Sequence, residues 1–137
     1  MDIKVFHQLP EDAADIRVEV FVDEQGFNEE FDSDDKSAVH FVGYIDGLAV
    51  ATCRVLDHGE DNYLIGRIAV KKLFRGKGLG SLIVKAAEEH IKRIGGKTIR
   101  IHSQLQAADF YEKIGYSKTG EFDEEEGCPH CMMIKHI

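Results

Sequence analysis

The feature that most limits how this chain can fold is a glycine-rich stretch between a strand-like and a helix-like segment. Residues 75–80, RGKGLG, carry glycine at every second position. The residues before them, 62–70, are rich in β-branched and apolar side chains, which favours a strand. The residues after them, 81–94, place apolar side chains on one helical face. Strand, glycine-rich turn and helix is the order in which backbone N–H groups and a helix N-terminus surround an anion.

The spacing of these glycines argues against two common nucleotide-binding loops. A triphosphate loop reads G-x-x-x-x-G-K-[ST], but here Lys77 stands between glycines and Ser81 follows Gly80 directly. A dinucleotide fingerprint reads G-x-G-x-x-G and needs an acidic residue after the next strand, but here the third glycine comes one residue early. Neither pattern fits the sequence.

The other segments predict one domain, residues 1–137, of the α+β class. The expected strands are 3–9, 38–46, 48–56, 62–70, 97–103 and 131–137, and the expected helices are 10–26, 79–94 and 107–115. Asp46-Gly47 between two apolar runs is a strong signal for a hairpin. The helix between strands 62–70 and 97–103 should make these two strands parallel, so we expect a mixed, mostly antiparallel sheet.

Charge and hydropathy argue against two classes of partner. The net charge of −8 opposes attraction to phosphates, and the 17 Lys and Arg residues are spread along the chain, so we expect no nucleic acid partner. No segment approaches the roughly 18 apolar residues of a membrane span, so we expect no membrane partner. No secretory signal opens the sequence, and three cysteines are too few for a disulfide framework. We therefore expect a cytoplasmic protein.

Residues 75–80 also fit the pattern [RQ]-x-x-G-x-[GA], and they resemble the pyrophosphate-binding motif of the GNAT superfamily of acyl-CoA-dependent N-acetyltransferases. The surrounding residues 65–91 look like the strand, turn and helix of that motif. Further along the chain, QLQAADFYEKIGYSKTG resembles the helix and strand that complete the acyl-CoA site of the family. The resemblance covers roughly residues 38–136 and implies a GNAT-like fold, with acetyl-CoA as cosubstrate.

The resemblance also implies which residues bind the cosubstrate. The cofactor-binding residues carried over are Ile68, Ala69 and Val70 for the pantetheine arm and acyl carbonyl, Arg75, Gly76, Lys77, Gly78, Leu79, Gly80 and Ser81 for the pyrophosphate, and Gln104, which stands where many members carry an asparagine. Tyr111 matches the tyrosine of the family that protonates the departing thiolate, and a phenol can donate such a proton. The structural alternative for Tyr111 is a core aromatic beside Phe110.

The acceptor side is indicated by two candidate bases and an acidic stretch. Residues 17–35 resemble the N-terminal signature of a small bacterial GNAT branch, which implies that Glu24 and Gln25 lie near the acceptor, with Glu24 as the favoured base. The alternative base is His130, in a Pro-His pair that the same branch often carries. Either residue could instead be structural, a glutamate facing water or a histidine bonded in a loop.

The acidic stretch itself, residues 23–35, carries seven carboxylates and no positive charge. Two interpretations stay open, a solvated loop or a rim that attracts a cationic amine. His40 and His102 lie on expected strands without distinctive partners in sequence, so we expect both to be structural.

Cys128-Pro129-His130-Cys131 spells the dithiol motif of oxidising disulfide oxidoreductases, which is the main rival interpretation. That chemistry relies on a helix N-terminus after the motif, whereas here a strand-like segment follows. A zinc site would combine Cys128 and Cys131 with His136 and a fourth ligand, Cys53 or His58, that only the fold could supply. We therefore expect neither redox chemistry nor a metal.

These observations predict an N-acetyltransferase that transfers an acetyl group to a primary amine by direct attack in a ternary complex. The acceptor is a small molecule or a protein amine, and the sequence does not distinguish the two. A non-catalytic acyl-CoA sensor is the alternative of another class, although the tyrosine at 111 favours the enzyme. An exposed final strand could pair two copies into a homodimer.

Overall fold

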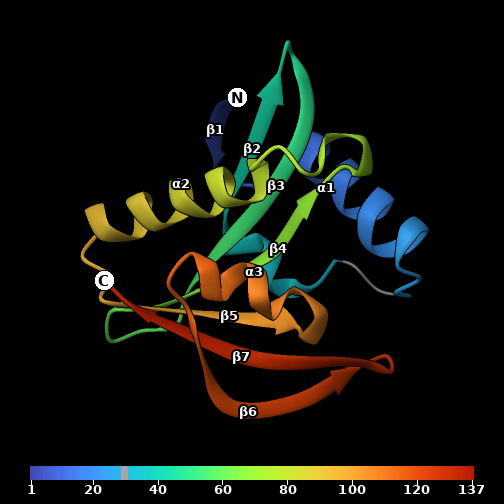
Figure 1. The fold of residues 1–137 in the computed structure, drawn as a ribbon. Coiled ribbons are helices and arrows are strands. Elements are labelled where there is room, and N and C mark those ends of the chain that lie inside the picture. The colour runs from blue at the N-terminus through green and yellow to red at the C-terminus, as the bar shows by residue number, and fades with distance from the viewer. Residues whose placement is uncertain (29–30) are drawn as a thin grey trace.

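The computed structural model describes residues 1–28 and 31–137. Its described residues form one sheet of seven strands, in the order β1-β2-β3-β4-β5-β7-β6 (Figure 1). The strands are β1 (Asp2–Phe6), β2 (Val39–Ile45), β3 (Leu48–Asp57), β4 (Asn62–Val70), β5 (Thr98–Gln104), β6 (Ser117–Glu125) and β7 (Cys128–His136), and the α-helices are α1 (Glu11–Arg17), α2 (Leu79–Arg93) and α3 (Ala108–Lys113). Among these described helices none is long and apolar enough to cross a membrane.

The strands β2, β3 and β4 form the predicted antiparallel meander, and β1 joins it beside β2, also antiparallel. β2 and β3 are joined at Asp46-Gly47, and both residues have positive φ angles, 51° and 80°. A two-residue turn of this kind matches the twist of the flanking strands, because its backbone is the mirror image of a common turn. The hairpin expected from the Asp-Gly pair is confirmed.

The predicted parallel pair is also confirmed, but it is short. β4 pairs with β5 only from Asn62–Leu64 to Thr98–Arg100, and the two strands then diverge (Figure 1). A bulge in β4 accompanies the divergence, since Gly66 pairs with Arg54 and Ala69 with Thr52, which leaves two residues opposite Cys53. Because a bulge bends its strand, the sheet opens into two halves with space between them.

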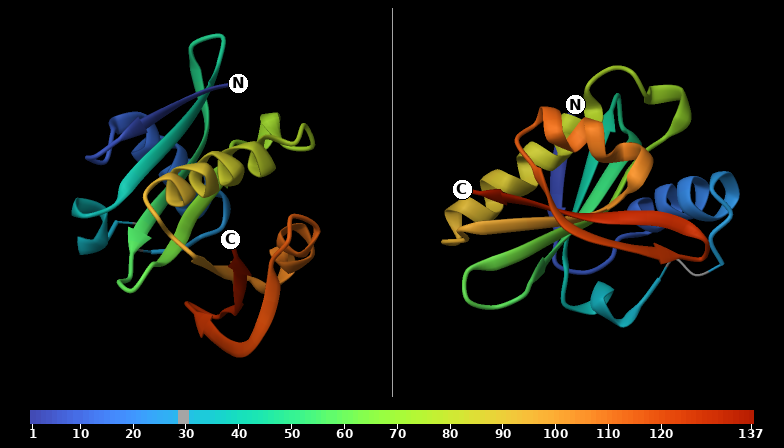
Figure 2. Two further views of the ribbon diagram at one scale, coloured as in Figure 1. Left: turned by 90° about the vertical axis from the view of Figure 1, so that its left-hand side faces the viewer. Right: turned by 60° about the horizontal axis from the view of Figure 1, so that its bottom comes forward.

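Two apolar clusters fix the helices on opposite faces of the antiparallel half (Figure 2). α2 covers the larger cluster with Ile83, Val84, Ala87 and Ile91, all fully buried. The buried face of α2 is narrower than its sequence predicts, because Leu82 and Ile94 are about half exposed, at 47% and 52%. α1 covers the smaller cluster on the other face with Ala13, Ile16 and Val20 of the following turn.

The first helix and the last strand differ from the prediction. Pro10 caps α1 instead of occupying its first turn, and after Arg17 the helix widens into a π-helical segment, Val18–Glu24. Three β-branched valines, at 18, 20 and 22, lower the α-helical propensity of this segment. The final strand β7 lies between β5 and β6, so the expectation that this strand is exposed and could pair two copies is wrong. The two edge strands of the described sheet are β1 and β6, and β6 is exposed throughout.

Candidate active site

The glycine-rich turn lies between the end of β4 and the N-terminus of α2. Gly76 and Gly78 have φ angles of 78° and 76°, a conformation that L side chains rarely adopt, and Gly78 caps α2. Because glycine offers no side-chain acceptor, the first amides of this 15-residue helix stay available to an anionic ligand. A Cβ on Gly80 would lie 3.3 Å from the Phe110 ring, so the same end of α2 approaches α3 closely.

The basic side chains of the turn already have partners. Arg75 donates two hydrogen bonds to the Glu24 carboxylate, at 2.6 and 2.7 Å, and a third from Nε to the Val70 carbonyl at 2.9 Å. The Lys77 ammonium lies 5.4 Å from the centre of the Phe74 ring. These contacts connect the turn to β4 and to the N-terminal helical segment.

Glu24, the favoured base in the sequence, is therefore engaged. The hydrogen bonds from Arg75 hold the pKa of the Glu24 carboxyl below its ordinary value, although partial burial opposes them. A carboxylate with a lowered pKa is a weaker base. Glu24 also does not line the cavity of about 460 Å³ described in the next paragraph, whereas its neighbour Gln25 does.

A cavity of about 460 Å³ occupies the space where β4 and β5 diverge. This volume is typical of a small-molecule site. Its walls come from β4, β5, β7, α3 and the N-terminal segment, and its lining includes Phe21, Gln25, Asp34, Arg54, Ile68, His102, Gln104, Tyr111, Glu125, Glu126 and His130. Of the predicted site residues, this cavity therefore brings together Ile68, Gln104, Tyr111 and His130.

Tyr111 stands in the wall of this cavity with 7% of its surface exposed. Its ring packs edge-on against Phe110 and Tyr116, with ring centres 5.1 and 6.3 Å away. Burial raises the pKa of the Tyr111 phenol above its ordinary value of 10.0, and the neighbouring Cys53 adds to the shift. The hydroxyl therefore carries its proton at neutral pH, and the raised pKa makes it a weaker acid than a free phenol.

His130 is a buried residue of β7 with 5% of its surface exposed. Its Nδ1–H donates to the Cys128 carbonyl oxygen at 2.8 Å, because a carbonyl can only accept. In the neutral ring this leaves the lone pair on Nε2, the nitrogen that can accept a proton.

His102, which was expected to be structural, also lines this cavity. The His102 ring stacks on His130 with ring centres 4.5 Å apart, and its Nε2–H donates to Asp123 at 2.7 Å. The partners Asp123 and Glu125 come from β6, a strand that was expected only through the family resemblance. Pairing of β6 with β7 brings Asp123 and Glu125 close to His102, and no local pattern in the sequence indicates this pairing.

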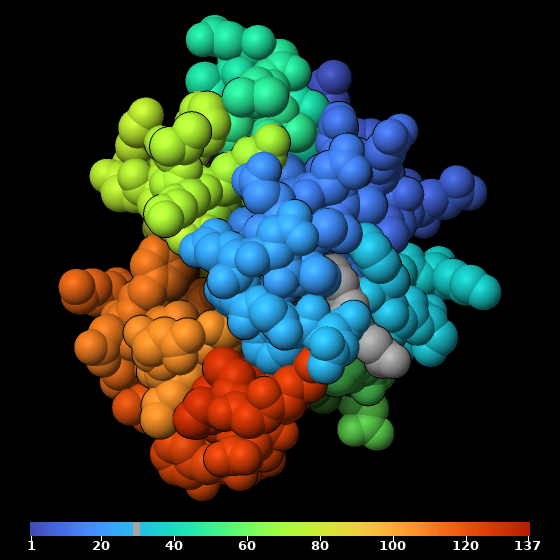
Figure 3. Space-filling model, turned by 90° about the vertical axis from the view of Figure 1, so that its right-hand side faces the viewer, coloured from blue at the N-terminus to red at the C-terminus, as the bar shows by residue number. Residues whose placement is uncertain are grey.

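Gln104 takes part in a chain of side-chain amides across the cavity mouth. Its Nε2 donates to Gln25 Oε1 at 2.7 Å, and Gln106 donates to Gln104 Oε1 at the same distance. Nearby, the backbone N–H of Asn28 donates to the Glu126 carboxylate at 2.9 Å. In Figure 3 the N-terminal helical segment, in blue, lies against both the yellow-green turn before α2 and the red C-terminal strands. It therefore covers one side of the site.

The acidic stretch does not behave as one unit. Residues 29–30 lie outside the described residues. Asp35 is buried, where it accepts from Arg17 at 2.8 Å and from Arg54 at 2.9 Å, and Asp32 pairs with Arg54 at 2.7 Å. Of the described carboxylates in this stretch, only Asp32 and Asp34 line the cavity, and Asp32 is neutralised by arginine.

The cysteine motif lies in an extended strand. Both cysteines are free, Cys131 is buried, and burial raises the pKa of its thiol. Three residues of strand span about 10 Å and turn successive side chains to opposite faces, which is incompatible with a dithiol site.

His40, expected to be structural, is buried and bonds the Asp35 carbonyl at 3.0 Å.

Comparison with known proteins decides the family. Residues 9–137 match the family described as "Acetyltransferase (GNAT) domain". The chain belongs to the GNAT acetyltransferases. A Bacillus subtilis (strain 168) protein named as an acetyltransferase is 40% identical over 128 residues, which covers 90% of this chain and 86% of the relative. The predicted GNAT fold and family are confirmed.

Solved GNAT structures agree with this fold. The crystal structure of a Lactobacillus plantarum protein named as an N-acetyltransferase superposes with a TM-score of 0.91 at 32% identity, covering 98% of this chain and 97% of that one. An acyl-CoA N-acyltransferase from Pseudomonas aeruginosa gives a TM-score of 0.87 at 25% identity over 98% and 99%. An aminoglycoside 6'-N-acetyltransferase crystallised with coenzyme A shares the fold at 15% identity, with a TM-score of 0.76 over 99% and 97%.

Proposed function

We propose that this GNAT protein transfers an acetyl group from acetyl-CoA to a primary amine by direct attack in a ternary complex. The observation that carries the proposal is the meeting of two features where the sheet opens. The N-terminus of α2 offers free amides beside α3, and the cavity of about 460 Å³ reaches Ile68 and Tyr111. Donor and acceptor can therefore approach each other from two sides of the opening.

The donor side uses the backbone more than side chains. The amides of the turn and of the first residues of α2, from Arg75 to Ser81, hold the pyrophosphate, with Gly78 and Gly80 closest to it. Ile68, Ala69 and Val70 belong to the part of β4 that diverges from β5. Their backbone groups contact the pantetheine arm and the acyl carbonyl. The amide near Val70 stabilises the oxyanion that forms when the amine attacks. The fold neighbour crystallised with coenzyme A supports this donor.

Two protons must move for an amide and a free thiol to form. An amine with a pKa near 10 is almost wholly protonated at neutral pH, so a base has to remove a proton before or during attack. The geometry favours His130 Nε2 over Glu24 for this step, because His130 lines the cavity and Glu24 is held by Arg75. Tyr111 then donates a proton to the departing thiolate and recovers it from solvent.

The charges around the cavity favour a small, cationic acceptor. Asp34, Glu125 and Glu126 line it together, while the carboxylate of Asp32 is balanced by Arg54 and Arg67. Carboxylates that are not balanced by arginine attract an ammonium group. We therefore propose a small primary amine with positive charge as the acceptor, in preference to a protein lysine.

A screen of amines tests the proposed activity. The protein is incubated with acetyl-CoA and a panel of diamines, amino sugars, amino acids and a lysine peptide, and free thiol and acetylated product are both measured. We expect release of thiol with a diamine or another small cationic amine. Tight binding of acetyl-CoA by calorimetry without product from any amine would instead support a non-catalytic sensor.

A further inference from the structure

Strand pairing gathers five polar side chains on one face of the C-terminal half of the sheet. His130 of β7 lies opposite Gln104 of β5 and opposite Asp123 of β6. His102 is two residues from Gln104, and Glu125 is two residues from Asp123, so all of them point to the same side. We call His102, Glu125 and His130 the histidine cluster. All three line the cavity described above.

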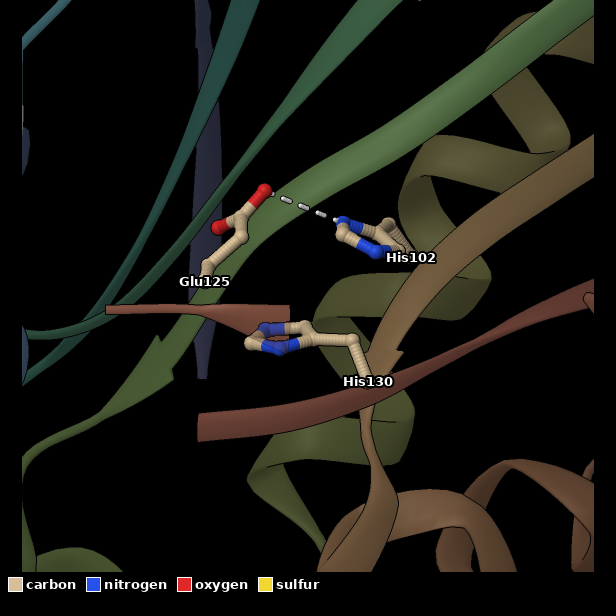
Figure 4. A group of neighbouring side chains, drawn as sticks. All are labelled: His102, Glu125 and His130. Carbon is tan, nitrogen blue, oxygen red and sulfur yellow. Dashed lines mark ion pairs between the residues drawn. The ribbon is translucent and has the colours of Figure 1, made fainter. Parts of the chain in front are cut away.

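The ligand atoms of the histidine cluster already lie close together (Figure 4). One atom from each residue lies within 4.8 Å of the other two, and His102 Nδ1 is 3.4 Å from Glu125 Oε1. Around a tetrahedral zinc ion with bonds of about 2.1 Å, ligand atoms lie roughly 3.4 Å apart. The His102–Glu125 pair thus has the spacing of bound ligands. The two imidazoles are stacked, with ring centres 4.5 Å apart and planes 29° apart, so one ring has to turn before both lone pairs point at the same ion. Glu125 is exposed and can adjust its own position.

The hydrogen bonds outside the cluster fix both imidazoles in the form that binds metals. His102 Nε2–H donates to the Asp123 carboxylate at 2.7 Å, and His130 Nδ1–H donates to the Cys128 carbonyl at 2.8 Å. Neither acceptor can donate, so in the neutral rings the lone pairs lie on His102 Nδ1 and His130 Nε2. Metal-binding histidines in proteins are oriented by this kind of bond on the second nitrogen.

We propose that His102, His130 and Glu125 form a binding site for a divalent transition metal ion of the zinc type. Two imidazoles with one carboxylate suit zinc and its neighbours, whereas magnesium and calcium prefer oxygen ligands alone. Three protein ligands leave one position of a tetrahedral ion open, and all three ligand residues line the cavity. The ion competes with the acceptor amine for His130, so zinc inhibits the transfer proposed above.

Metal binding is measured directly on chelator-treated protein at neutral pH, by titration calorimetry with Zn²⁺ and by the visible spectrum with Co²⁺. We expect one ion per chain and a Co²⁺ spectrum without a sulfur-to-metal band. Glu125→Gln and His102→Ala each lower the affinity at least 100-fold, and Asp123→Asn, which removes the partner of His102, lowers it by about 10- to 100-fold. Thermal unfolding of each variant verifies that it is folded.

Two matched variants separate this site from other zinc ligands. His58→Ala removes a cavity histidine outside the cluster, and Cys128→Ser removes the more accessible thiol of the cysteine motif. Both should bind Zn²⁺ with unchanged affinity. An affinity unaffected by Glu125→Gln and His102→Ala, loss of binding in Cys128→Ser, or no binding at all would overturn the proposal. Because the readout is binding, this result is independent of whether amine transfer is observed.

Discussion

Tyr111 has one property that a proton donor to a thiolate needs, a fixed place in the cavity wall. Its ring is held by Phe110 and Tyr116. Burial raises the pKa of its phenol, so the group carries its proton before the thiolate leaves but is a weaker acid than a free phenol. Sequence reasoning located this tyrosine through its motif, but only the packing shows that it lies in the same cavity as His130.

Replacing the hydroxyl of Tyr111 tests this role. Tyr111→Phe keeps the ring packing and removes the proton donor, so kcat should fall by about 100-fold, the lower range for loss of an acid catalyst, while affinity for acetyl-CoA changes less than twofold. Steady-state kinetics and calorimetry measure the two quantities. Tyr116→Phe is the matched control, because it removes a hydroxyl bonded to Glu88 outside the cavity. Equal turnover of the two variants would remove the assigned role.

The turn before α2 owes its shape to glycines in a conformation that other residues rarely adopt. A Cβ on Gly78 would meet no neighbouring atom, so packing does not require glycine there. Glycine is required by the positive φ angle, and it also lets a ligand approach the backbone without a side chain in the way. The spacing of the glycines predicted this turn. The prediction succeeded because the strand before the turn and the helix after it both have strong local sequence patterns.

Elements that depend on long-range pairing were not predicted from local patterns. β6 has no buried side chain and therefore no apolar periodicity, so its place at the sheet edge beside β7 follows from pairing alone. The contact of Glu24 with Arg75 joins residues 51 positions apart, and neither residue signals the other. For the same reason the histidine cluster, built on three strands, was missed.

An aspartate at position 78 tests the anion cradle as an element. Gly78→Asp places a carboxylate at the N-terminus of α2, so like-charge repulsion and bulk should lower the affinity for acetyl-CoA at least 100-fold while the fold survives. Calorimetry measures the affinity and circular dichroism the fold. Gly59→Asp is the matched control, because Gly59 has a similar φ angle of 82° and equally open surroundings in a distant turn. The cradle hypothesis fails if both variants bind acetyl-CoA like the original protein.

A network of arginines and aspartates joins the N-terminal helix to the sheet across the whole molecule. Asp35, on a short turn before β2, accepts from Arg17 of α1 and from Arg54 of β3, while Asp32 accepts from Arg54 and Arg67. Burial would raise the pKa of Asp35, but the hydrogen bonds and charges of the arginines outweigh it and bring the pKa to about 2. The sequence shows this stretch only as an acidic run, since its partners lie far along the chain.

The network predicts how stability depends on pH. The carboxyl of Asp35 has a pKa of about 2 in the folded chain against 3.8 for the free group, so between these values the unfolded chain binds more protons. The resulting stabilisation, about 2 kcal/mol, is complete above about pH 5 and is lost as the pH falls towards 2. Urea unfolding at a series of pH values measures this decline.

Asp35→Asn should remove this part of the decline and lower the free energy of unfolding at neutral pH by about 3 kcal/mol, because it leaves the buried Arg17 and Arg54 without their shared carboxylate. Asp34→Asn, a change at the exposed neighbour, should leave both the stability and its pH dependence near those of the original chain. A stability that stays level between pH 4 and 2 in the original protein, or the same profile in both variants, would show that the network does not hold the N-terminal helix to the sheet.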